Sequence, residues 1–189
     1  FAENNYKQSI PILIETIEEV KQGRAYNISL SALYVLLSTC YQMDRDIDNA
    51  RRSVALASEA ISGKQEMTKY VYITTMVKLN KITMHYLAGE MNEVIEEALD
   101  LLKYEEEKRY KGYSDHASFY LAFAYFQIRQ EEKGIRWFQK ALCMMLISPE
   151  AANMQYLSSY EIFDVMMRDK RIYKDLVDEF KNKYKLIGL

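Results

Sequence analysis

Apolar residues recur every three or four positions along most of the chain, a spacing typical of amphipathic helices. Only two prolines and six glycines occur in the 189 residues, too few for the many turns of a β-sandwich or barrel. The pattern therefore predicts an all-α fold in a single domain over 1–189. Its predicted helices number about nine, over roughly 6–20, 28–43, 46–61, 67–88, 92–109, 115–128, 131–146, 150–167 and 170–184.

One pattern of small and large residues occurs twice in these helices. Leu37-Ser38-x-x-Tyr41 is followed, nine residues after the tyrosine, by Ala50-x-x-x-Val54-x-x-Ala57. Leu121-Ala122-x-x-Tyr125 is followed at the same distance by Gly134-x-x-x-Phe138-x-x-Ala141. The small residues allow two helices to approach closely, and the large ones fill the space between them. Because one hairpin cannot bury both of its faces, neighbouring hairpins are expected to stack.

A third copy of the pattern is less regular. Ile82-Thr83-x-x-Tyr86 is followed by Val94, Ala98 and Leu101 after a turn that is one residue shorter. The segment 5–9 resembles the opening of a second helix, so the first helix of that hairpin would precede Phe1. The chain is therefore expected to be a fragment of a longer protein.

These motifs resemble the signature of the tetratricopeptide repeat family. The resemblance covers most of the chain and implies a TPR-like α-solenoid, a right-handed superhelix of antiparallel helical hairpins. It also implies a concave groove, lined by the first helix of each hairpin, that binds a protein or peptide ligand. The long, irregular hairpins resemble those of bacterial regulatory proteins. The implied function is a non-enzymatic binding scaffold, the regulatory or sensor portion of a larger bacterial signalling or transcription-regulatory protein.

Counting from the motif tyrosines predicts the side chains that face this groove. They are Thr39 and Gln42 in the first hairpin, Asn80 and Met84 in the next, and His116, Phe119, Phe123 and Phe126 in the third. The amide of Asn80 can both donate to and accept from a peptide backbone, or it can be a plain surface residue. The phenylalanines recur at i, i+4 and i+7. Burial under a neighbouring helix or a dimer partner is favoured over an open aromatic groove, because such stripes usually belong to a core.

Net charge, hydropathy and the positions of the cysteines limit which partners and which compartment are expected. The net charge of −2 is evenly interspersed, which argues against direct nucleic-acid binding by this segment. The acidic run Glu105-Glu106-Glu107 is expected to be a solvated helix end. No stretch of about eighteen uncharged apolar residues occurs, so no membrane span is expected. Cys40 and Cys143 stand far apart in apolar helical patterns, and buried free thiols there favour the cytoplasm.

No constellation of catalytic residues stands out. His85 and His116 are the only histidines, and neither lies in a metal-binding or nucleophile-activating motif. No enzyme activity, cofactor or metal is therefore expected. Two other functions stay open. One is a homodimerisation domain whose aromatic face is a subunit interface, and the other is a small-molecule or hydrolytic role for Tyr and Glu side chains inside the superhelix.

Overall fold

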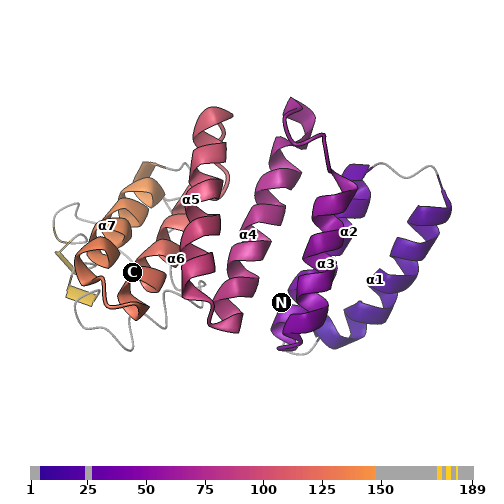
Figure 1. Cartoon of the computed structure of the whole chain (residues 1–189), viewed down its shortest axis with the longest axis horizontal. Helices are drawn as coiled ribbons and strands as arrows, with labels where there is room; N and C mark the ends of the chain where they lie inside the picture. The colour runs from indigo at the N-terminus through magenta and orange to yellow at the C-terminus, as the bar shows by residue number, and fades with distance from the viewer. Residues whose placement is uncertain (1–4, 24–26, 148–173, 176–177, 180–181, 183–189) are drawn as a thin grey trace. The chain divides into compact units, whose positions relative to one another are not determined.

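The computed structural model describes residues 5–23, 27–147, 174–175, 178–179 and 182. These residues form seven α-helices and one short 3-10 turn, which confirms the predicted all-α class (Figure 1). The last two predicted helices, over about 150–167 and 170–184, lie almost entirely outside the described residues. The chain divides into two compact units, 1–113 and 114–189, which we describe separately. The single domain over 1–189 stays a prediction.

Unit 1 contains five α-helices that pack as antiparallel neighbours in chain order (Figure 1). They are α1 (Asn5–Gln22), α2 (Asn27–Met43), α3 (Ile47–Ala60), α4 (Val71–Ala88) and α5 (Met91–Glu107), with the 3-10 turn η1 (Thr68–Tyr70) before α4. α2 also packs directly against α4, so the first helices of two successive hairpins are neighbours. Ile17, Tyr34, Val54 and Ile73 belong to the core between α1 and α4.

Unit 2 contains the hairpin of α6 (Ser114–Gln127) and α7 (Glu131–Ile147). Phe119 of α6 meets Phe138 of α7 edge to face, with ring centroids 5.6 Å apart and an interplanar angle of 63°. Both rings are buried. Edge-to-face aromatic pairs add about 0.5–1.5 kcal/mol beyond the area they bury, so this pair stabilises the contact between the two helices.

The turns of three hairpins share one hydrogen-bond pattern. In each, a backbone N–H donates to the carbonyl five residues earlier, and the residue before the donor has a left-handed conformation, as in a Schellman motif. The donor and acceptor pairs are Asp46 and Tyr41, Glu90 and His85, and Gln130 and Tyr125. His85 is therefore the structural equivalent of the motif tyrosines, and all three turns have the same length.

The alignment of the third motif on Tyr86 is consequently wrong by one residue. With His85 in the tyrosine position, Val94 becomes the equivalent of Ala50 and of Gly134, and all three are buried. The register was missed in the sequence because a histidine stands where the other two hairpins have a tyrosine. Tyr86 follows His85 immediately, so the motif was aligned on Tyr86 instead.

His85 also ties three helices of unit 1 together through Glu90. Its Nδ1 atom lies 2.6 Å from Glu90 Oε2, at the start of α5. Arg51 of α3 donates to both carboxylate oxygens of Glu90, at 2.9 and 3.1 Å. The hydrogen bond from His85, followed by the bond from Arg51, lowers the pKa of Glu90 below its usual value of 4.5. The folded protein therefore stabilises the ionised form of Glu90, and ionisation of this carboxyl in turn stabilises the fold.

The contribution of Glu90 to stability is expected to depend on pH. Because its pKa is lower in the folded state, the stabilisation is present above pH 4.5 and is lost as the pH falls through the lowered pKa. Urea midpoints of wild type and Glu90→Gln should differ at pH 6 and converge toward pH 3. Glu93→Gln, which removes an exposed carboxylate from the first turn of the same helix, is the control. A difference between wild type and Glu90→Gln that is constant over this range would contradict the assignment.

Candidate functional site

A cavity of about 200 Å³ lies between α2 and α4 of unit 1. It brings together three of the predicted groove residues, Thr39, Gln42 and Asn80. The remaining lining residues are Val35 of α2, Met76, Leu79 and Thr83 of α4, and Tyr113. The first helices of two successive hairpins thus form the walls, the arrangement that the resemblance to helical repeats implies for a groove.

An amide network joins the two walls. Gln42 Nε2 donates to Asn80 Oδ1 at 3.0 Å and lies 3.3 Å from the Asn80 carbonyl oxygen. Asn80 Nδ2 donates to Thr39 Oγ1 at 3.0 Å. Gln42 is 4% exposed and Asn80 8%, so Asn80 is not the plain surface residue that was the alternative. Buried amides keep a fixed orientation when they bond to each other, so the network gives the cavity a rigid polar part.

Met84 does not line this cavity. Its side chain is 2% exposed and lies in the core. The cause is the register of the α4–α5 hairpin, in which counting from His85 instead of Tyr86 moves the groove-facing positions by one residue. Leu79 and Thr83 then become the equivalents of Val35 and Thr39, and both line the cavity.

The other four predicted groove residues belong to unit 2. Phe119 is 1% exposed and Phe123 8%, so these rings are buried in the single chain, while Phe126 is half-buried. His116 Nδ1 lies 2.8 Å from Asp115 Oδ1. Although burial opposes ionisation of Asp115, its bonds with His116 lower the pKa of that carboxyl. Burial of Phe119 and Phe123 agrees with the interpretation that the helical spacing favours.

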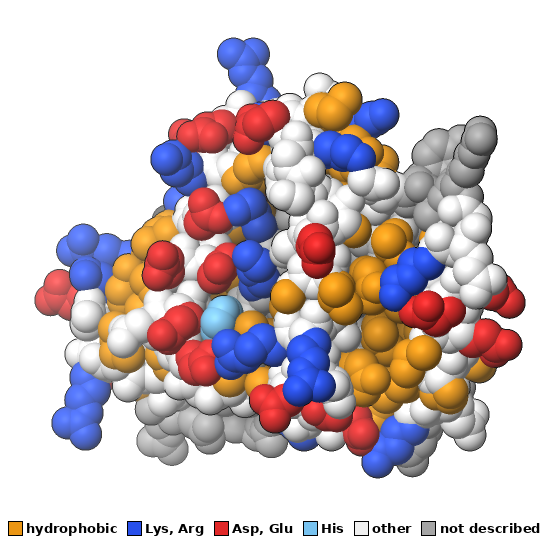
Figure 2. Space-filling view, turned by 45° about the vertical axis from the view of Figure 1, so that its right-hand side comes forward, with side chains coloured by type: hydrophobic (Ala, Val, Ile, Leu, Met, Phe, Trp, Pro, Cys, Tyr) orange, Lys and Arg blue, Asp and Glu red, His pale blue; other side chains and the backbone are white. Residues whose placement is uncertain are grey.

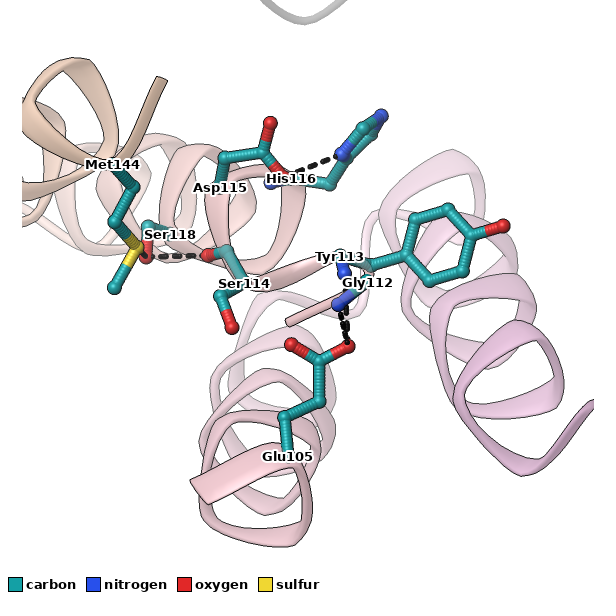
Figure 3. Close-up of polar contacts among 8 residues, drawn as sticks. All are labelled: Glu105, Gly112, Tyr113, Ser114, Asp115, His116, Ser118 and Met144. Atoms are coloured by element: carbon teal, nitrogen blue, oxygen red, sulfur yellow. Dashed lines mark hydrogen bonds and ion pairs between the residues drawn. The ribbon is translucent and has the colours of Figure 1, made fainter. Parts of the chain in front are cut away.

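Tyr113 is a lining residue that sequence analysis missed, and a buried carboxylate holds its backbone. Glu105 is 1% exposed, and its Oε1 atom accepts hydrogen bonds from the N–H groups of Tyr113 at 2.8 Å and Gly112 at 3.2 Å (Figure 3). The Tyr113 side chain is half-buried. Burial, followed by a hydrogen bond with Tyr72, raises the pKa of Tyr113, so the phenol stays neutral near pH 7.

The position of Glu105 corrects the expectation of a solvated acidic run. Glu106 and Glu107 are exposed, as expected, but Glu105 is buried. A signal was present in the sequence, because Glu105 follows Ala98 and Leu101 at helical spacing, and both of these residues belong to the core. A glutamate on the apolar face of a helix is seldom buried unless its oxygens find donors, and the backbone at 112–113 supplies them here.

A second cavity of unit 1, of about 250 Å³, lies between α4 and α5 and is lined largely by charged residues. Its lysines are engaged, since Lys78 pairs with Asp100 and Lys103 Nζ lies 3.9 Å from Glu107 Oε1. In the described part of the chain, Thr74 Oγ1 is the only side-chain nitrogen or oxygen atom that is itself closed off from solvent and makes no hydrogen bond. This cavity therefore presents ion pairs rather than free binding groups.

No family model, curated protein or solved structure matches the chain. Within the described residues, no three His, Cys, Asp or Glu side chains gather as metal ligands, and no helix is long and apolar enough to cross a membrane. Cys40 is half-buried, and this burial raises the pKa of its thiol. Cys143 is exposed, so the expectation that it is buried was wrong.

Proposed function

We propose that this chain is a non-enzymatic protein- or peptide-binding scaffold, and that an extended segment of the partner binds along α2 and α4 of unit 1. The observation that carries the proposal is the cavity between these helices, where Thr39, Gln42 and Asn80 meet. These are residues that the resemblance to helical repeats assigns to a ligand groove.

The size of the cavity favours a peptide over a free small molecule. At about 200 Å³ it is smaller than the roughly 300–1,000 Å³ of pockets that enclose drug-sized ligands. It is larger than the cavity of about 150 Å³ that holds a benzene molecule. The cavity therefore has room for one side chain, and the rest of the ligand must lie on the surface outside it.

Exposed apolar side chains offer that outer surface. Leu36 is 49% exposed and Met43 58% exposed, and with Thr39 they follow the i, i+3, i+7 spacing of one face of α2. Figure 2 shows apolar side chains gathered over the α1–α3 part of unit 1. A peptide whose anchor enters the cavity can bury further apolar area there, at about 25 cal/mol per Å².

The wider setting of the scaffold is part of the same proposal. The right-handed, TPR-like superhelix of about nine helices would extend the hairpin arrangement of units 1 and 2. The shared turn of three hairpins and the buried small–large pattern support it. In this setting the chain is the regulatory or sensor portion of a larger bacterial signalling or transcription-regulatory protein in the cytoplasm. Homodimerisation through the aromatic face has less support, because Phe119 and Phe123 are already buried in the single chain.

Peptide binding is expected to fail when a charge enters the cavity. Met76→Lys places an ammonium group on the apolar wall, so peptides selected from a displayed library on wild type should bind this variant at least about tenfold more weakly, or about 1.4 kcal/mol. Fluorescence anisotropy with labelled peptides gives the dissociation constants.

Leu99→Lys is the matched control, because Leu99 is an exposed leucine of α5, 40% exposed and outside the cavity. Its affinity for the peptides should equal that of wild type. Circular dichroism verifies that both variants remain helical. If wild type selects no peptide, or if the two variants bind equally well, the groove is not the binding site.

A further inference from the structure

The cavity between α2 and α4 has apolar sides and a polar part with unused hydrogen-bonding capacity. Val35, Met76 and Leu79 supply apolar walls. Among the described residues, Asn80 Nδ2 makes a single hydrogen bond, to Thr39, although a primary amide has two hydrogens to donate. No described hydrogen bond ends on Gln42 Oε1. One donor and one acceptor are therefore open to a ligand group that can both accept and donate.

A phenol satisfies these requirements of size and chemistry together. A single aromatic ring fits a cavity of about 200 Å³, because benzene occupies a cavity of about 150 Å³. A phenolic hydroxyl both donates and accepts, so it can bond to Gln42 Oε1 and to Asn80 Nδ2 at once. An aliphatic anchor would leave Gln42 Oε1 and the second hydrogen of Asn80 Nδ2 without a hydrogen-bond partner. A carboxylate anchor would place a charge against the apolar walls of the cavity.

Tyr113 determines how large this anchor can be. Its half-buried side chain forms part of the lining, and Glu105 fixes the backbone on which it stands through hydrogen bonds of 2.8 and 3.2 Å. An incoming aromatic ring can pack on the ring of Tyr113 in the offset or edge-to-face geometry that aromatic pairs prefer.

We propose that the partner anchors itself in this cavity by a tyrosine side chain, and that Tyr113 is the specificity-determining residue that limits the anchor to one ring. The proposal rests on the proposed function and names the ligand chemistry of the same site. Truncation of Tyr113 would add space for roughly one more ring, which a two-ring indole could fill.

Three small probes test the chemistry of the cavity directly. p-Cresol, toluene and 3-methylindole represent the side chains of Tyr, Phe and Trp, and amide shifts of α2 and α4 in ¹⁵N NMR spectra report their binding. On wild type, p-cresol should bind about fivefold more tightly than toluene, the effect of one hydrogen bond of about 1 kcal/mol, and 3-methylindole should cause no shifts. Tyr113→Ala should gain 3-methylindole binding.

Two further variants secure the interpretation. Tyr113→Phe keeps the ring and removes only the hydroxyl, so it should retain the probe order of wild type. Tyr113→Leu enlarges the cavity while it keeps an apolar side chain, and it serves if Tyr113→Ala does not fold. Equal binding of 3-methylindole and p-cresol to wild type, or the same probe order in wild type and in the truncated variants, overturns the proposal.

Peptides separate this inference from the proposed function. Selected peptides should contain a tyrosine whose replacement by Phe, Gln or Trp weakens binding to wild type, and the Trp peptide should recover affinity on Tyr113→Ala. If peptides bind the groove without any dependence on a tyrosine, the scaffold function stands and the anchor is wrong. If no peptide binds, the proposed function is wrong, and the tyrosine anchor proposed for the partner is wrong as well.

Discussion

Phe123→Glu is expected to unfold the α6–α7 hairpin rather than to separate two subunits. Phe123 is only 8% exposed, so the substitution loses the burial of an aromatic ring, which costs about 3–5 kcal/mol even when alanine replaces it. It also places a carboxylate where water has little access, and an unpaired buried charge costs several kcal/mol more. Urea unfolding followed by circular dichroism, together with the mass from light scattering, measures both effects.

Gln127→Glu is the matched control, because it adds the same charge at an exposed position of the same helix. Its urea midpoint should stay close to that of wild type. A folded Phe123→Glu monomer with an unchanged midpoint would show that Phe123 is not part of a core. A folded monomer obtained from a wild-type dimer would show instead that the aromatic face is a subunit interface.

The positions that were predictable from the sequence are those where packing alone selects the residue. Ala50, Val54 and Ala57 are all at most 3% exposed, as the small–large spacing predicts for the face of a second helix. The same spacing places Phe138 and Ala141 in the core of unit 2. Helical periodicity carries this information locally, because positions three and four residues apart share one face.

The candidate site was predictable only in part, because its remaining residues depend on contacts between distant segments. Thr39 and Gln42 follow from counting along α2 from Tyr41. Asn80 was reached by counting from Tyr86, one residue out of register, and it lines the cavity beside the correctly counted positions. Tyr113 lies in the connection after α5, and no helical period places a connection residue beside a groove. The buried role of Glu105 depends on two backbone N–H groups that lie seven and eight residues further along the chain.

Glu105→Ala is expected to lower the free energy of unfolding of unit 1 by about 3 kcal/mol. Hydrogen bonds to a charged acceptor contribute about 1.5–3 kcal/mol each, and truncation also leaves the N–H groups of Gly112 and Tyr113 without this acceptor. Glu106→Ala removes the exposed carboxylate next to it and should change the free energy by less than about 0.5 kcal/mol. Urea unfolding compares the two variants.

Hydrogen exchange identifies the cause of the expected loss. In wild type the amide hydrogens of Gly112 and Tyr113 should exchange slowly, and in Glu105→Ala they should exchange faster relative to the helical amides of α5. Glu105→Gln should lie between, because a neutral acceptor forms a hydrogen bond about half as strong as a carboxylate does. If Glu105→Ala and Glu106→Ala unfold at the same urea concentration, Glu105 does not hold the backbone at Tyr113. The end of the cavity must then be shaped by the side-chain contacts of Tyr113 alone.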